Sequence, residues 1–218
     1  DANTTGSNNN AYGYGASGAN TTGIHNNSFG TLAVADCTTG GYNIAMGSNA
    51  LRATTTGVQN VGLGHGALYA NTTGGNNVAV GIQALDANTT GAENIGIGSN
   101  ALGENTTADS NVAIGGGALA SNTTGSSNVA VGRSSLNSNV SATNNTAVGH
   151  QTLAANTGSF NTALGAFVLD ANTIGASNVA VGYGALSENT TASNNTAVGS
   201  VALLANTTGA NNVAVGYA

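Results

Sequence analysis

The chain lacks proline, tryptophan and lysine, and it contains one cysteine and one methionine in 218 residues. A single cysteine allows no disulfide within the chain, so this is not a disulfide-stapled scaffold. Only 5% of the residues are charged, and the net charge of −6 comes with two basic residues, Arg52 and Arg133. Such a surface neutralises phosphates poorly, so we expect no nucleic-acid partner and no docking on anionic membranes.

Long apolar runs are also absent, and none approaches the roughly 18 residues that a membrane-spanning helix requires. We therefore expect no direct insertion into a membrane. The low charge and the regularly spaced Val, Ile and Leu residues also argue against a disordered linker.

A fixed repeat dominates the remaining sequence. The repeat position of the Asn-Thr-Thr-Gly motif at residues 71–74 starts thirteen times, with substitutions in some copies, and eleven of the twelve spacings are 17 residues. Self-similarity at a fixed period is typical of a solenoid or array. We therefore interpret residues 1–218 as a single repeat array of about thirteen 17-residue repeats.

One copy is shorter by a residue, between Asn156 and Asn172. It has lost one threonine of the Asn-Thr-Thr-Gly segment and keeps the element at residues 161–165. Surface loops tolerate such deletions, so this segment is predicted to be a loop. The array also starts and stops partway through a repeat without an atypical polar cap, so we expect a fragment of a longer fibre.

Each repeat carries a short alternating segment, exemplified by Val78, Ala79 and Val80. Period-2 alternation with β-branched residues predicts a strand. We expect Val78 and Val80 to face Leu85, on a second short strand, across a thin core. The small residue at Ala79 would then face outward, where another chain packs closely.

Two glycines and one asparagine recur around this strand. Gly74 and Gly81 are predicted at corners, where a positive φ favours glycine. The asparagine before the strand recurs in almost every copy, and stacked asparagines can form a hydrogen-bonded ladder. The ladder positions include Asn77, Asn94, Asn111 and Asn128.

The predicted fold class is all-β, a parallel β-roll or β-solenoid of 17-residue turns. One turn buries about three apolar side chains at roughly 1.5–3 kcal/mol each. Ordering its backbone costs about 1–2 kcal/mol per residue. Because single turns are unstable alone, we expect stacking within the chain and lateral packing between chains.

The Asn-Val-Ala-Val-Gly element followed by Ala-Leu resembles the head repeats of trimeric autotransporter adhesins. With the preceding Asn-Thr-Thr-Gly segment, it is also similar to repeats of bacteriophage tail fibres. The adhesin repeat is shorter, and the extended Asn-Thr-Thr-Gly turn is inserted here. The resemblance implies a homotrimeric fibre at a cell surface or on a virion that binds a host or environmental receptor, a glycan among the candidates.

Residues that carry chemistry are few and scattered. His65 and His150 lie five repeats apart and cannot share a metal within one chain, and His25 lies in a third repeat. Cys37 replaces the leading asparagine of a turn and is expected to be exposed. The acids show no spacing that general acid–base catalysis requires; they include Asp36, Asp86, Glu93, Glu104, Asp109, Asp170 and Glu188. We expect no catalytic, metal or cofactor site.

The leading hypothesis is a structural or adhesive fibre segment outside the cell, and the chain is not expected to be an enzyme. An ice-binding β-solenoid that uses threonines such as Thr72 and Thr73 is the alternative. A polysaccharide-cleaving β-helix is a third reading, although its acids would cluster on one face. The Asn-Thr-Thr motifs are also formal N-glycosylation acceptors.

Overall fold

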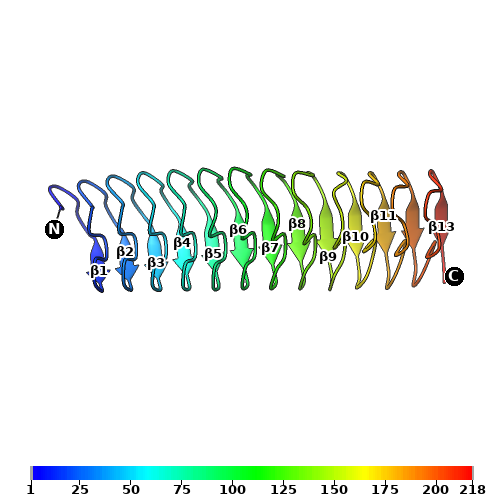
Figure 1. The fold of residues 1–218 in the computed structure, drawn as a ribbon, viewed down its shortest axis with the longest axis horizontal. Helices are drawn as coiled ribbons and strands as arrows, with labels where there is room; N and C mark the ends of the chain where they lie inside the picture. The colour runs from blue at the N-terminus through cyan, green and yellow to red at the C-terminus, as the bar shows by residue number, and fades with distance from the viewer. Residues whose placement is uncertain (1, 218) are drawn as a thin grey trace. The chain divides into compact units, whose positions relative to one another are not determined.

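The computed structural model describes residues 2–217, and the chain divides into two compact units, Asp1–Ser110 and Asn111–Ala218. Asp1 and Ala218 lie outside the described residues. Each repeat forms one coil with a single three-residue strand, and successive coils stack within each unit (Figure 1). The strands of the first unit are β1 (Asn10–Tyr12), β2 (Asn27–Phe29), β3 (Ile44–Met46), β4 (Val61–Leu63), β5 (Val78–Val80) and β6 (Ile95–Ile97).

The second unit contains seven strands of the same length. They are β7 (Val112–Ile114), β8 (Val129–Val131), β9 (Thr146–Val148), β10 (Thr162–Leu164), β11 (Val179–Val181), β12 (Thr196–Val198) and β13 (Val213–Val215). The described residues contain no helix long and apolar enough to cross a membrane.

Within each unit every strand pairs in parallel with the next one. Val78 pairs with Ile95 and Ala79 with Gly96, so equivalent residues lie in register. At the short repeat Thr146 pairs with Thr162, and the register is kept despite the 16-residue step. The all-β parallel β-solenoid with a 17-residue period is therefore confirmed, as is the placement of the deletion outside the strand.

The predicted orientation of the strand is wrong. Ala79 is fully buried, whereas Val78 and Val80 are each partly exposed. The space inside the coil explains this, because a Cβ added to Gly96 would lie 3.3 Å from Leu85 Cγ. A valine facing inward would overpack the core beside the leucine, so only alanine, glycine or serine occupies this position.

The second strand predicted at Leu85 is also absent. Leu85 is fully buried in a turn and has a φ of 54°, in the left-handed region that branched side chains seldom adopt. Backbone hydrogen bonds between coils continue through this turn, since Leu85 N–H donates to Ala101 O at 3.0 Å. Burial of the leucine side chain, worth about 1.5–3 kcal/mol, offsets the cost of its backbone conformation.

The two recurring glycines are required for different reasons. Gly81 has a φ of 137°, a conformation that excludes most other residues. Gly74 does not have a positive φ, so that part of the prediction is wrong. A Cβ on Gly74 would instead overlap Asn71 Oδ1 and the carbonyl oxygen of Gly91 in the next coil.

Buried asparagines form ladders that join successive coils. Asn77 donates from its backbone N–H and from Nδ2 to Asn60 Oδ1, at 3.0 and 3.2 Å. Its Nδ2 also donates to Gly91 O at 2.8 Å. In the second unit Asn128 makes the same two contacts with Asn111 Oδ1.

A second ladder runs beside the first through the leading asparagines of the turns. Asn88 Nδ2 donates to Asn71 Oδ1 at 2.8 Å and to Gly91 O at 3.0 Å. Both asparagines are fully buried. The carbonyl of Gly91 thus accepts from both ladders, which ties the loop to the strand entrance.

We predict that Asn77→Ala destabilises the chain by roughly 2–4 kcal/mol, because it leaves buried hydrogen-bonding groups unpaired. The backbone N–H of Asn94, which donates to Asn77 Oδ1, loses this acceptor. Urea denaturation followed by circular dichroism measures the effect. Thr73→Ala, in the same coil but exposed, is the control and should stay within about 0.5 kcal/mol. Equal midpoints for the two variants would contradict the role of the ladder.

Candidate functional site

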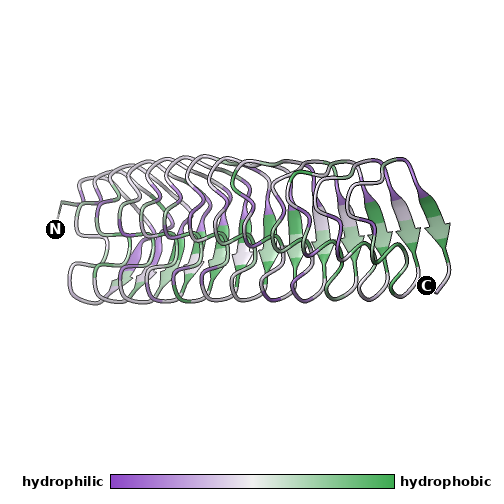
Figure 2. Ribbon diagram, turned by 45° about the vertical axis from the view of Figure 1, so that its right-hand side comes forward, coloured by the Kyte–Doolittle hydropathy of each residue, from purple (hydrophilic) through white to green (hydrophobic). Residues whose placement is uncertain are grey.

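The first candidate surface is the outer strand face, formed by the first and third residues of each strand. None of these residues is charged, and from β3 onward they are aliphatic residues, methionine or threonine. Many remain well exposed, including Ile44 at 40% and Met46 at 52%. In Figure 2 the strand arrows of the second unit are largely green, the colour of apolar residues.

The outer strand face changes character in the first two coils. β1 presents Asn10 and Tyr12, and β2 presents Asn27 and Phe29. Tyr12 is 77% exposed. The aliphatic part of the face in the first unit therefore begins at β3.

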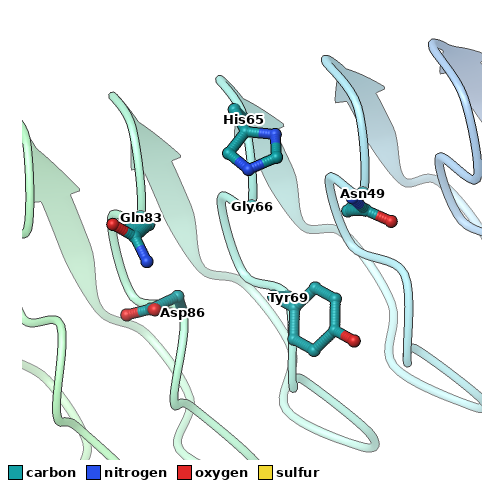
Figure 3. Close-up of a pocket in the computed structure, with 6 residues that line it drawn as sticks. All are labelled: Asn49, His65, Gly66, Tyr69, Gln83 and Asp86. Carbon is teal, nitrogen blue, oxygen red and sulfur yellow. The ribbon is translucent and has the colours of Figure 1, made fainter.

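The second candidate is a pocket in the turns that follow β3, β4 and β5, which we call the turn pocket (Figure 3). It has a volume of about 320 Å³. Its lining residues are Asn49, His65, Gly66, Tyr69, Gln83 and Asp86. All six belong to the first unit.

The turn pocket exists because Gly66 lacks a side chain. Asn49 and Gln83 occupy the same repeat position in the neighbouring coils, with φ values of 58° and 54°. A Cβ added to Gly66 would contact only Gln83 Cγ, at 3.8 Å. A notch one side chain wide is therefore left between two amide side chains.

Glycine occupies this repeat position in three other coils, where neighbouring side chains approach more closely. Leu32 Cδ2 lies 2.8 Å from the Cβ position of Gly15. Val201 Cγ1 lies 3.3 Å from that of Gly184, and Asn137 Nδ2 lies 3.5 Å from that of Gly117. The notch at Gly66 is the most open of the four among the described residues.

Tyr69 and Asp86 form the other wall of the turn pocket. Arg52 Nη1 donates to the Tyr69 hydroxyl at 3.3 Å, and its guanidinium carbon lies 5.8 Å from the ring centroid. Burial raises the pKa of the Asp86 carboxyl, and the charge of Glu104 raises it further. The backbone N–H groups of Asp86 and Ala87 act in the opposite direction.

The three histidines lie in separate surroundings. His25 stacks on Tyr42 with ring centroids 4.9 Å apart, and His150 meets the edge of Phe167 at 5.3 Å. His65 lines the turn pocket. The described residues contain no group of three or more His, Cys, Asp or Glu side chains that could hold a metal ion.

Cys37 is buried, so the expectation that it is exposed is wrong. The leading position of the turn points inward, as it does for Asn71. The Cys37 thiol donates to Gly40 O at 3.4 Å, and burial raises its pKa. A thiol with a raised pKa is a poor nucleophile at neutral pH.

Most Asn-Thr-Thr motifs are unsuitable for N-glycosylation in the folded chain because their asparagine is buried, although Asn3 is exposed. Asn71 is fully buried and its Nδ2 donates to Gly74 O at 3.0 Å, so a sugar there would disrupt the ladder. Thr72 Oγ1 donates to Thr89 O at 3.0 Å, and Thr73 is exposed. In this coil, therefore, only the second threonine of the turn is exposed.

Sequence reasoning missed the turn pocket. The sequence contains a pattern that could have indicated it, since glycine replaces a larger residue at position 66 and Tyr69 and Asp86 share one repeat position.

No protein-family model, curated protein or solved structure matches the chain. The outer strand face and the turn pocket are therefore the features from which a function is inferred.

We predict that Asp86→Asn alters the pH dependence of stability. A raised pKa means that the folded state binds this proton more tightly than the unfolded state does. Stability should therefore fall as the pH rises from about 3.9, the ordinary value, through the folded pKa. Asp86→Asn should remove this decline, so that the variant melts above the wild type at pH 7 but not below the ordinary pKa.

Thermal melting between acidic and neutral pH measures this effect. Glu188→Gln removes an exposed acid elsewhere and serves as the control. Parallel curves for the wild type and Asp86→Asn would show that burial does not perturb this carboxyl.

Proposed function

We propose that this chain is a structural and adhesive fibre segment that associates laterally as a homotrimer. The fibre would lie outside the cell, as the shaft or head of a bacterial surface adhesin or a phage tail fibre. It would present a region that binds a host or environmental surface. The resemblance of the repeat to those of trimeric adhesins and tail fibres supports this proposal, and it includes no catalytic step.

The observation that carries the proposal is the apolar outer strand face. Contiguous exposed apolar patches on soluble proteins mark interaction surfaces. Leu63 and Val80 lie in adjacent parallel strands and both point outward. Burying such a half-exposed side chain contributes on the order of 1 kcal/mol, and the contribution recurs in each coil.

A second copy of the chain is the occupant that fits this face. The strands present similar residues at a constant step, so an identical chain can contact the face along many coils. The face has no charged residue that would have to be desolvated. A different partner would need an equally long apolar surface with the same spacing.

Ice binding is a second candidate, favoured by one observation. In the first unit Thr56, Thr73 and Thr90 are exposed at the same position of successive coils. However, the adjacent threonine column uses its hydroxyls on backbone carbonyls, as Thr72 does. The exposed hydroxyls thus form one column on a turn, whereas the apolar face lies on the strands.

Light scattering of the whole chain tests lateral association. We expect a mass about three times the 20.8 kDa of one chain. The double substitution Val78→Lys and Val80→Lys should lower the mass, because it places two charges on the outer strand face. Thr73→Lys, in the exposed turn of the same coil, is the matched control and should leave the trimer intact.

Circular dichroism distinguishes dissociation from unfolding in the lysine variant. A wild-type chain with the mass of a monomer would contradict the trimer. It would favour binding by a single face, including the exposed threonine column.

A further inference from the structure

We propose that the turn pocket binds one neutral sugar residue of a surface glycan. The inference rests on the proposed adhesive function and names the chemical class of the receptor. It uses a different part of the coil from the outer strand face, since the pocket lies in the turns after β3, β4 and β5.

The size of the pocket suits a single sugar ring. Its volume of about 320 Å³ is at the lower end of the roughly 300–1,000 Å³ found for small-molecule sites. The notch at Gly66 gives it depth, and the walls come from three successive coils (Figure 3). A terminal or branching residue of a glycan could enter while the rest of the chain stayed in solvent.

Tyr69 supplies an aromatic surface of the kind that sugars pack against. The ring is 40% exposed, and the contact with Arg52 restrains it. The face of an aromatic ring carries partial negative charge and attracts the slightly positive C–H groups of a sugar. Arg52 is not among the residues that line the pocket, which contain no arginine or lysine.

The other walls supply the mixture of donors and acceptors that hydroxyl groups need. The amides of Asn49 and Gln83 both donate and accept, the carboxylate of Asp86 accepts, and His65 can do either. A sugar hydroxyl both donates and accepts, so it can bridge two such groups.

Asn49 has a hydrogen-bond acceptor that no described residue uses. Its Oδ1 is shielded from solvent and has no hydrogen-bond partner among the described residues, while Nδ2 donates to Ser48 Oγ at 3.3 Å. Buried acceptors are usually paired. A modest rotation about χ2, a broad torsion in asparagine, would bring this oxygen to a hydroxyl donor in the pocket.

The charge of the site favours a neutral ligand. Asp86 stands in the wall, and the whole chain has a net charge of −6. Phosphate, sulfate or a uronic acid would be repelled at close range. A neutral hexose satisfies the polar groups without this repulsion.

The test measures binding of methyl glycosides of glucose, galactose, mannose and N-acetylglucosamine to the whole chain by NMR. Galacturonate and choline serve as anionic and cationic probes. We expect one neutral glycoside to bind with a Kd of roughly 0.1–10 mM, with shifts at the amides of Gly66, Tyr69 and Asp86. Tyr69→Ala should weaken binding at least about tenfold, a loss of 1.4 kcal/mol or more.

Gly66→Asn is the decisive variant, because it fills the notch with a residue that Asn49 already places at this position with a φ of 58°. It should abolish binding while leaving the fold unchanged. Gly117→Asn is the matched control at the same repeat position, where φ is also positive at 67°. It lies outside the turn pocket and should bind the sugar like the wild type.

Three results would overturn the proposal: no shift with any neutral glycoside at about 50 mM, binding that survives Gly66→Asn, or binding of choline or galacturonate alone. Light scattering on the same samples separates this inference from the proposed function. A trimer that binds no sugar refutes only the pocket, whereas a monomer that binds sugar refutes only lateral association.

Discussion

The structure depends on the hydrogen bonds that buried asparagine amides make between coils. Asn77 shows the pattern: its Nδ2 donates to Oδ1 of Asn60 in the previous coil and to the carbonyl oxygen of Gly91 in the turn of the next coil. Its own Oδ1 accepts from Asn94 of the next coil. Parallel strands lie about 4.8 Å apart, a step that the amide spans only when equivalent residues are in register. At the short repeat the Asn161 backbone N–H still donates to Asn145 Oδ1 at 2.9 Å, whereas its Nδ2 donates to Asn156 Oδ1 at 3.1 Å.

The ladder leaves little room inside the coil, and this has a functional consequence. The asparagines and one leucine fill the interior, so the strand can turn only its smallest residue inward, as Ala79 shows. The larger aliphatic residues are therefore placed outside, where a soluble single chain would gain nothing from them. In-register stacking also places equivalent turn residues next to one another in successive coils. Where glycine replaces a larger residue, as at Gly66, a notch opens between the coils.

The period of the sequence was sufficient to predict parallel stacking, the register, the asparagine ladder and the location of the deletion. It did not predict which strand face is buried, because alternation distinguishes two faces without assigning one to the interior. The usual preference for burying valine failed since the leucine already fills the core. The prediction of a strand at Leu85 was wrong because the sequence does not reveal a left-handed backbone at a branched residue.

The turn pocket depends on differences between neighbouring coils, which the consensus of a repeat conceals. Ser17 and Ser28 illustrate the same point, since two departures from the consensus in adjacent coils pair their hydroxyls at 2.7 Å.

Hydrogen exchange of the ladder amides tests this account most directly. The backbone N–H groups of Asn43, Asn60 and Asn77 each donate to an asparagine Oδ1 within the buried interior. The account predicts that these protons, and the Nδ2 protons of the same residues, exchange as slowly as the most protected amides of the strands. Exchange at the rate of exposed turn amides would show that the ladder does not hold the coils together.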